Sequence, residues 1–495
     1  MAAPTVLTLG TERPATPFAS GRKQLLIGGQ WRPASTGATL DTVDPTTEQV
    51  LASLASASAD DVGDAAAAAR RAFTDGPWPA MTPYERGRAL LRVAELTERH
   101  AEELATLESL EMGGPIWLTR YMIAHVVEVL HHYAGWPGKI YGQSAPAGPG
   151  LLSYTRRPPI GVVAGITAWN GPLLQLSWKL GPALATGNTI ILKPAEQASL
   201  STLRFGELIQ EADLPPGVVN IVTGGRETGE AIVGQPGVDK ITFTGSTAVG
   251  KRILAASVDR LARVTLELGG KSPTIVFADA DLPAAAEAAA GAFCAGSGQG
   301  CVAGTRIFVA EPVREEFLAL LAKSVEAYQL GDPFHADTKM GPLASREHYE
   351  RVSGYFDIAR RDTASVLLGG ELPATTGLFV QPTVFGDVGN DARVAQEEIF
   401  GPMAVLMSFP TEDDAVRLGN DTSYGLAASV WTRDVGRAHR LAERLDCGTV
   451  WLNTYGVMSA GTQPFGGFKQ SGIGREHGTA VLDEYTETKS VFVAM

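Results

Sequence analysis

The segment around Cys301 holds the residues with the clearest capacity for chemistry. It reads Gly298-Gln299-Gly300-Cys301, and another glycine follows at Gly304. Glycines leave the backbone open, so a substrate can come close to the sulfur. A cysteine kept for packing more often lies within an apolar periodic run. Cys301 is therefore a candidate nucleophile, which needs a base and a donor for a developing oxyanion.

Two distant polar residues could meet those needs. Glu267 ends a predicted strand and precedes two glycines, which suits a movable general base. A solvated glutamate at a domain join explains the same pattern equally well. Asn170 lies between a predicted strand and a predicted helix, where its amide could donate to an oxyanion. From the residues alone, a helix N-cap is the better explanation of Asn170.

Further strand ends carry groups that could hold a dinucleotide. Lys193 and Glu196 follow one predicted strand, and a carboxylate there could accept from a ribose 2′-hydroxyl and repel a 2′-phosphate. Gly245 and Ser246 lie in a strand-to-helix turn whose N–H groups could hold a pyrophosphate. Ordinary turns explain both patterns, and no G-x-G-x-x-G follows the first strand. No metal site is expected, since the eight histidines include no zinc spacing.

The elements that must position these residues alternate along the chain. The first third is predicted to be helical, with a capping box from Thr82 to Glu85. β-branched runs and helical segments then alternate, which is typical of a doubly wound parallel sheet. The pattern restarts near 266–271, so we expect two such sheets. The predicted strands are 161–166, 189–192, 218–222 and 240–243, then 273–277, 306–309 and 449–452; the helices of the first series are 173–185, 199–212, 227–233 and 247–256.

Composition narrows the class of protein. The chain has 495 residues, 44% of them apolar and 19% charged, and a net charge of −13. The acidic balance argues against nucleic acid or a membrane as partner. Three cysteines form no disulfide framework, which favours a reducing cytoplasm. Residues 1–24 are expected to be a flexible arm. The β-prone tail 486–493 should pair with another subunit or close its own sheet.

The order of the motifs resembles that of the NAD(P)-dependent aldehyde dehydrogenase superfamily, from about Leu25 to the C-terminus. The resemblance implies an α/β fold of two doubly wound Rossmann-like domains with a small β bridging element for a homodimer or homotetramer. It places an NAD-binding domain at 25–133 and 154–265, a catalytic domain at 266–463 and the oligomerisation element at 134–153 and 481–495. The matching segments are 169–170, 193–196, 243–246, 266–273, 298–301, 397–402, 464–469, 471–472 and 474–476.

The resemblance also implies roles for single residues. Cys301 would attack an aldehyde and form first a thiohemiacetal and then, after hydride transfer to NAD, a thioester. Asn170 and the Cys301 N–H would hold the oxyanion, and Glu267 would activate the hydrolytic water. The residues expected to contact NAD are Trp169, Lys193, Glu196, Gly245, Ser246, Gly269, Glu398 and Phe400.

Departures from the family pattern bear on the substrate. Glycine is rare at the position of Gly300 and leaves the thiol more freedom. Gly171 replaces a bulky aromatic residue that often follows the oxyanion asparagine, which predicts a wider tunnel. With no arginine for a carboxylate in the expected wall, the substrate should be a neutral, apolar aldehyde. The expected tunnel residues are Gly171, Gln175, Trp178, Met122, Tyr455, Met458 and Phe465.

Two alternatives accompany this interpretation. A CoA-acylating semialdehyde dehydrogenase would pass the acyl group to CoA instead of water, and Glu267 argues against it because that branch usually lacks a carboxylate there. A non-catalytic structural relative is disfavoured because Cys301, Asn170 and Glu267 are all present. The expected function is thus the NAD-dependent oxidation of an aldehyde to its carboxylic acid.

Overall fold

The structure is a computed structural model that describes residue 14 and residues 16–495. Most of the expected arm, residues 1–24, lies outside the described residues. The end of that segment, Arg22–Lys23, forms strand β1, which pairs with β5 (Val50–Ala55). β4 (Thr39–Val43) completes this small sheet on the other side of β5.

The first large sheet has eight strands in the order β22-β12-β11-β8-β9-β10-β2-β3. Its central strands, from β12 to β10, are all parallel. The edges are antiparallel, where β22 joins β12 and β2 joins β10. The strands are β2 (Leu25–Ile27), β3 (Gln30–Arg32), β8 (Val162–Ile166), β9 (Thr189–Lys193), β10 (Val219–Ile221), β11 (Lys240–Thr244), β12 (Arg263–Glu267) and β22 (Gly472–Ile473).

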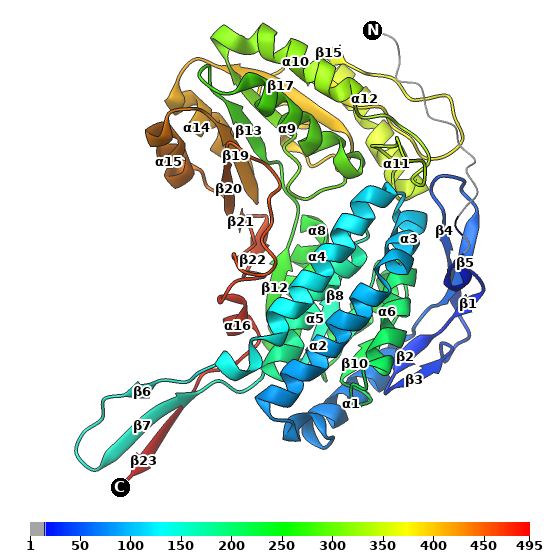
Figure 1. The fold of residues 1–495 in the computed structure, drawn as a ribbon, viewed down its shortest axis with the longest axis vertical. Coiled ribbons are helices and arrows are strands. Elements are labelled where there is room, and N and C mark those ends of the chain that lie inside the picture. Colours follow the sequence, from blue (N-terminus) through cyan, green and yellow to red (C-terminus); the bar gives the residue numbers. More distant parts are fainter. Residues whose placement is uncertain (1–13, 15) are drawn as a thin grey trace.

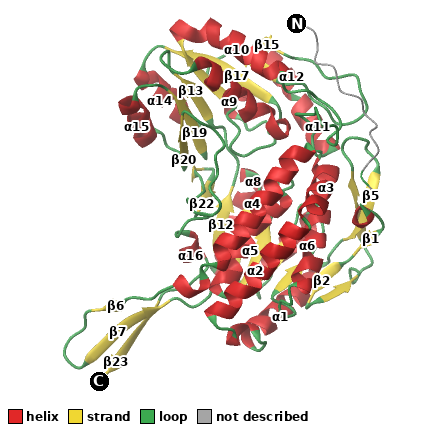
Figure 2. Ribbon diagram, viewed as in Figure 1, coloured by secondary structure: helices red, strands yellow, loops and turns green. Residues whose placement is uncertain are grey.

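Helices cover both faces of this sheet (Figure 2). Alternate side chains of β8 point to opposite faces, with Val163 in one hydrophobic core and Val162 in the other. The Val163 face packs against α5 (Pro172–Thr186) and α6 (Leu200–Glu211). Behind these two helices lie α2 (Pro83–Arg99), α3 (Ala101–Met112) and α4 (Ile116–Ala134). The Val162 face is covered by α1 (Ala59–Thr74), α7 (Arg226–Gly234) and α8 (Thr247–Ser257).

The second large sheet has seven strands in the order β15-β16-β17-β14-β13-β19-β20. All neighbours are parallel except β15, which runs antiparallel to β16. Its strands are β13 (Pro273–Val276), β14 (Arg306–Ala310), β15 (Ser365–Leu368), β16 (Thr383–Gly386), β17 (Met403–Phe409), β19 (Ala427–Trp431) and β20 (Thr449–Leu452). The helices are α9 (Leu282–Cys294) and α10 (Arg314–Glu326) on one face, and α11 (Arg346–Ser353), α12 (Tyr355–Arg361), α13 (Arg393–Gln396), α14 (Glu412–Asn420) and α15 (Val435–Arg444) on the other.

A three-stranded β arm projects from the body, with the C-terminus at its tip (Figure 1). It consists of β6 (Ser144–Ala145), β7 (Leu151–Arg156) and β23 (Lys489–Ala494), with β7 in the middle. The C-terminal tail therefore closes a sheet of its own chain. The short helix α16 (Val481–Glu484) precedes β23. Among the described residues, no helix is long and apolar enough to cross a membrane.

The fold agrees with the predicted α/β class, including two doubly wound sheets. The expectation that the first third is helical was wrong for residues 22–55, which form the five short strands β1–β5. β2 and β3 turn at Gly28 and Gly29, both with positive φ, as a two-residue hairpin requires. Strands of two to six residues are too short to display a clear alternating pattern in the sequence. Their formation depends on pairing with partners that are distant along the chain.

Candidate active site

Cys301 lies in the loop between α9 and β14, where it is partly exposed. Glycines shape this loop: a Cβ at Gly298 would lie 2.2 Å from the Gly401 carbonyl oxygen, and one at Gly270 would lie 2.4 Å from the Cys301 carbonyl oxygen. Of the other cysteines, Cys294 is fully buried and Cys447 donates its S–H to the Thr449 carbonyl at 3.3 Å. Only Cys301 lines the two cavities described below.

The surroundings of Cys301 disfavour its thiolate. Burial raises the pKa of the thiol to about 12, and the negative charges of Glu398 and Glu267 contribute to the rise. A group that removes the proton, or a positive charge nearby, is therefore needed before this sulfur becomes a strong nucleophile at neutral pH.

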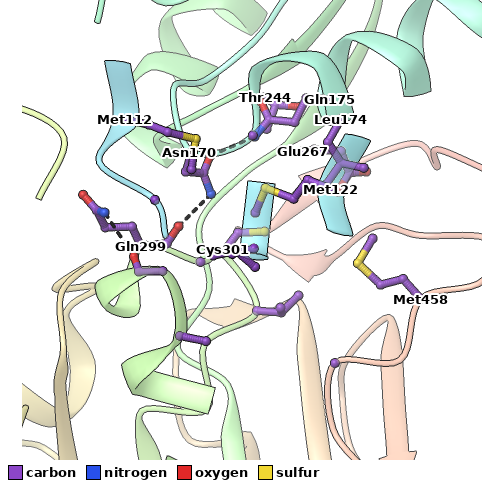
Figure 3. A pocket seen from close by; sticks show the side chains of 18 of the residues that line it. Met112, Met122, Asn170, Leu174, Gln175, Thr244, Glu267, Gln299, Cys301 and Met458 are labelled. Carbon is purple, nitrogen blue, oxygen red and sulfur yellow. Dashed lines mark hydrogen bonds between the residues drawn. The ribbon is translucent and has the colours of Figure 1, made fainter. Parts of the chain in front are cut away.

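Asn170 is held with its amide directed at the Cys301 loop (Figure 3). It follows β8, and its Nδ2 donates to the Gln299 carbonyl at 2.8 Å. Its Oδ1 accepts from Gln175 Nε2 at 2.8 Å, and Gln175 is fixed in turn by the Ala168 N–H. Because an amide carries two N–H hydrogens, one remains for a ligand. The N-cap interpretation was wrong: Gly171 occupies the cap of α5, with no side-chain bond.

Glu267 ends β12, next to β11 at the carboxyl edge of the first sheet, where open α/β sheets bind ligands. It is 3% exposed, and neither carboxylate oxygen has a hydrogen-bond partner among the described residues. Burial and the negative charge of Glu476 raise its pKa well above the usual range, against the positive charges of Lys179 and Arg475. An unpartnered carboxyl with a raised pKa is suited to taking up a proton near neutral pH.

A buried ion pair lies behind Glu267. Lys179 Nζ is 2.5 Å from Glu476 Oε1 and 2.7 Å from Thr244 Oγ1. Both charged side chains are almost completely buried. No motif around Lys179 indicated this position, although Glu476 lies within the 474–476 segment of the resemblance.

The first cavity, of about 250 Å³, opens in front of Cys301, Asn170 and Glu267. Six of the seven expected tunnel residues line it. Tyr455 does not: its hydroxyl donates to the Val302 carbonyl at 3.1 Å, and its ring packs on Trp451. The expected residues that line the cavity are Met122, Gly171, Gln175, Trp178, Met458 and Phe465; those that sequence reasoning missed include Met112, Gly113, Gly114, Leu118, Leu174, Ala295, Gly296 and Pro342.

The second cavity, of about 340 Å³, shares six lining residues with the first: Asn170, Gln175, Thr244, Glu267, Leu268 and Cys301. Part of its wall is backbone, because a Cβ at Gly245 would lie 2.4 Å from the Phe243 ring and one at Gly269 would lie 2.2 Å from Glu398 Oε2. The other expected cofactor residues that line it are Trp169, Ser246, Glu398 and Phe400, and the wall also includes Glu347, His348 and Arg351, which sequence reasoning missed.

Contacts among these wall residues fix their positions. Glu398 Oε1 accepts from the Gly270 N–H at 2.9 Å, and burial raises its pKa to about 7. The Trp169 ring lies 5.0 Å from His348 and 5.2 Å from Phe400, centroid to centroid. His348 contacts the Phe400 carbonyl through Nε2 at 2.7 Å, and burial lowers its pKa to about 4, so the ring is neutral at pH 7.

Lys193 and Glu196 lie outside the lining of both cavities. Lys193 Nζ is 3.9 Å from Glu196 Oε2 and donates to the Pro194 carbonyl at 3.2 Å. Burial lowers the pKa of Lys193, and the charge of Glu196 opposes that shift. A Cβ at Gly229, in α7, would lie 3.8 Å from the lysine side chain. The pair thus faces α7 rather than Cys301.

Comparisons with known proteins place nearly the whole chain in one family. The family model described as the aldehyde dehydrogenase family matches residues 31–491. Human mitochondrial aldehyde dehydrogenase is 44% identical over 479 residues, which cover 95% of this chain and 92% of the relative. The NAD+ complex of a Bacillus cereus aldehyde dehydrogenase has a TM-score of 0.94 at 45% identity, covering 96% of this chain and 97% of that one. A mutant of the P. syringae AldA indole-3-acetaldehyde dehydrogenase, in complex with NAD+ and IAA, has a TM-score of 0.94 at 39% identity, covering 96% and 97%.

Proposed function

Because this chain belongs to the aldehyde dehydrogenase family, we propose that Cys301, Asn170 and Glu267 carry its reaction and that its substrates are neutral, apolar aldehydes. The reaction itself is the oxidation of an aldehyde to the carboxylic acid with NAD. One observation supports the residue roles above all others: these three side chains line both cavities, at the place where the cavities meet.

The first half of the reaction is the attack by Cys301. Its sulfur bonds to the carbonyl carbon, the C=O π pair moves to oxygen, and Glu267 receives the thiol proton. The free N–H of Asn170 and the Cys301 backbone N–H stabilise the oxyanion. When the oxyanion re-forms the carbonyl, the hydrogen on carbon leaves with its electron pair and a thioester remains. NAD, when bound, supplies the acceptor for that hydride.

The second cavity has features that fit NAD. Its wall at Gly245 and Gly269 is bare backbone, so a pyrophosphate can approach the main chain closely there; the Gly245 N–H itself already donates to the Glu267 carbonyl at 3.0 Å, so the N–H groups at the start of α8 would be the donors. Glu398 and Phe400 would hold the nicotinamide ribose, while Trp169 and Ser246 would line the path of the cofactor. Lys193 and Glu196, beside α7, would contact the adenosine ribose.

The second half is the hydrolysis of the thioester. Glu267 first releases the thiol proton to solvent, which restores its carboxylate. It then accepts a proton from water while the water oxygen bonds to the acyl carbon. When the C–S bond breaks, the acid leaves and Glu267 returns that proton to the sulfur, which regenerates the thiol. The two unpartnered oxygens of Glu267 support this role, because a water molecule would satisfy them. The same two oxygens favour water over CoA as the acyl acceptor, because they could hold and deprotonate a water molecule beside the thioester.

The lining of the first cavity supports the substrate class. Apart from Glu267 and the thiol, its side chains are apolar or neutral amides and hydroxyls. A carboxylate substrate would find no cationic partner in this wall, and its desolvation would be costly. The similar enzyme that acts on indole-3-acetaldehyde uses a neutral aldehyde with an apolar ring.

The test compares Cys301→Ser with the matched control Cys447→Ser, using hexanal, NAD and the absorbance of NADH. We expect Cys301→Ser to lose at least about a thousandfold in kcat, and Cys447→Ser to keep its activity. Nuclear magnetic resonance of the wild-type products, with and without CoA, should give the free acid in both cases. Substantial turnover by Cys301→Ser would refute the nucleophile, and dependence on CoA would favour the acyl-CoA alternative.

We also propose that the chain forms a homodimer or homotetramer in the cytoplasm. The projecting β arm leaves apolar side chains such as Phe492 exposed, and a second copy could cover them. All three cysteines are free, as is usual in a reducing compartment.

A further inference from the structure

We infer that the substrate cavity is built for aldehydes that are branched, or carry a ring, at the carbon next to the carbonyl, and that Gly171 and Gly300 determine this specificity. The inference rests on the proposed function. It concerns the first cavity, whose lining includes Met112, Gly113, Leu118, Gly171, Ala295 and Gly300.

Three of the six glycines in this cavity wall are required by their backbone conformation, and a fourth is restricted by neighbouring side chains. Gly113, Gly296 and Gly456 have φ values of 72°, 57° and 71°, which side chains other than glycine rarely adopt. A Cβ at Gly114 would lie 3.0 Å from Met112 Cε. Each of these glycines therefore has a local structural reason.

Gly171 and Gly300 have no such reason. Neither has a φ in the left-handed region. A Cβ at Gly300 would meet no atom nearer than the Ala303 nitrogen at 4.0 Å, and a Cβ at Gly171 would lie 3.6 Å from Leu174 Cβ, an ordinary contact. Both positions could carry a side chain, and that side chain would occupy the cavity. Their effect in this structure is to leave space.

The position of that space points to the substituents next to the carbonyl. Gly300 directly precedes Cys301, which would bond to the carbonyl carbon, and Gly171 directly follows Asn170, which would hold the carbonyl oxygen. The 2.8 Å bond from Asn170 to the Gln299 carbonyl joins the two loops. The freed volume thus lies beside the reacting carbon, where a straight chain presents only a CH₂ group.

Other residues of this cavity wall suit apolar branches. Ala295 is small, and Met112 has a flexible, polarisable thioether that adapts to different shapes and packs well against rings. Met122 contributes a second thioether to the same cavity (Figure 3). A branch placed here is removed from water against apolar atoms.

The test uses two isomeric six-carbon aldehydes, hexanal and 2-ethylbutanal, which differ in branching at the carbon next to the carbonyl. The readout is the ratio of kcat/KM for 2-ethylbutanal to that for hexanal. We expect the wild-type ratio to be at least about 0.1, and Gly171→Leu to lower it at least about tenfold, since single methylenes in apolar pockets discriminate by that much. Gly300→Ala, the smallest possible change, should lower the ratio in the same direction.

The control is Gly234→Leu, at an exposed position where an added Cβ meets no atom within 4 Å; it should keep the wild-type ratio. A wild-type enzyme that oxidises hexanal but not 2-ethylbutanal, or an unchanged ratio in Gly300→Ala and Gly171→Leu, overturns the inference and leaves the proposed function standing. If the wild type oxidises neither aldehyde, the proposed substrate class fails instead.

Discussion

At the scale of single residues, Cys301 combines the position of a nucleophile with surroundings that keep it protonated. Burial and the charges of Glu398 and Glu267 raise its pKa to about 12. Its reactivity therefore depends on partners brought to it, and we propose that these are Glu267 as proton acceptor and the positive nicotinamide ring of NAD, when bound. A resting thiol of this kind resists alkylation and oxidation, because the thiolate is the reactive form.

We predict that without NAD the alkylation of Cys301 by iodoacetamide rises about tenfold per pH unit from pH 7 to 9. The sign follows from the raised pKa, since the thiolate fraction keeps growing with pH and saturates only near the pKa. Peptide mapping by mass spectrometry measures the rate at Cys301, with the buried Cys294 in the same sample as an internal reference. A plateau below pH 8 would contradict the raised pKa.

The second prediction concerns Glu267→Gln, which keeps the shape of the side chain and removes its capacity to accept a proton. We expect thioester hydrolysis to slow about 10²- to 10⁴-fold, and hydride transfer to slow less. Stopped-flow absorbance should then record a burst of about one NADH per subunit followed by slow turnover. Linear kinetics at a uniformly reduced rate would instead mean that removal of the Cys301 thiol proton, the other role proposed for Glu267, limits the variant, and would contradict a dominant role in hydrolysis.

At the scale of elements, helix α3 secures the starts of two other helices. Its Glu111 accepts from the Ser199 and Leu200 N–H groups at the start of α6 at 3.0 and 2.7 Å, and from the Thr42 hydroxyl at 2.9 Å. Its Glu108 accepts from the Leu173 N–H at the start of α5 at 2.9 Å. Since α5 follows Asn170 directly, α3 helps to position this residue, the proposed oxyanion donor. Burial raises the pKa of Glu111 to about 8 and that of Glu108 to about 7.

The raised pKa of Glu111 makes the stability of the folded protein depend on pH. Below about pH 4.5 the Glu111 carboxyl is protonated in both the folded and the unfolded chain. Between pH 4.5 and about 8 this carboxyl ionises only in the unfolded chain. The free energy of unfolding therefore falls as the pH rises through this range. Glu111→Gln should reduce the fall in Tm between pH 5 and 8, while Glu111→Ala should cost about 1–3 kcal/mol by leaving donors unpaired. Differential scanning fluorimetry at both pH values measures this. Parallel pH profiles of wild type and Glu111→Gln would refute it.

The sequence predicted best where local signals agree with the fold. The capping box of α2 forms as expected, with Thr82 and Glu85 bonded reciprocally, and the apolar runs became buried parallel strands. Cys301, Asn170 and Glu267 could be selected because each lies in a distinct motif, although their roles stay predictions. Leu174 could have been found, since it shares a helix face with Gly171 and Trp178.

Other parts of the site left no local signal. His348 and Arg351 belong to α11, which packs on the second large sheet. They line the second cavity only because this part of the molecule packs against the first large sheet. Lys179 looks like any helical lysine until its partner Glu476, 297 positions away, is known. Tyr455 was wrongly predicted to line the substrate tunnel. Residues that are close together on a loop can direct their side chains to opposite sides, and the sequence does not show which side each one takes. Long-range contacts of this kind cannot be derived from spacing.

At the scale of the whole molecule, the β arm stands apart from the body and carries exposed apolar side chains on paired strands. Phe492 is 70% exposed, and Leu151, Leu152 and Val493 are each at least 40% exposed. Such a surface is costly to leave in water and offers a strand edge for pairing.

We predict that Phe492→Asp reduces the assembly to a smaller species, down to the monomer of 52.1 kDa, because a charge would be buried without a partner. Light scattering coupled to size-exclusion chromatography measures the mass. Val435→Asp is the matched control, at a 73% exposed valine on α15, away from the arm, and should leave the mass unchanged. A wild-type protein that is already monomeric would refute the proposed oligomer.

The edge strand β22 has a consequence for how the protein is made. It comes from residues 472–473 yet lies beside β12, with Gly472 opposite Glu267, and Glu476 follows to meet Lys179. A chain still under synthesis has made Cys301 and Glu267 long before this segment leaves the ribosome. Glu267, the proposed general base, then lies at an unfinished sheet edge and lacks the ion pair behind it. We therefore expect catalytic competence only after residues 472–476 have been made, and a chain truncated before Gly472 should lack activity although Cys301, Asn170 and Glu267 are present.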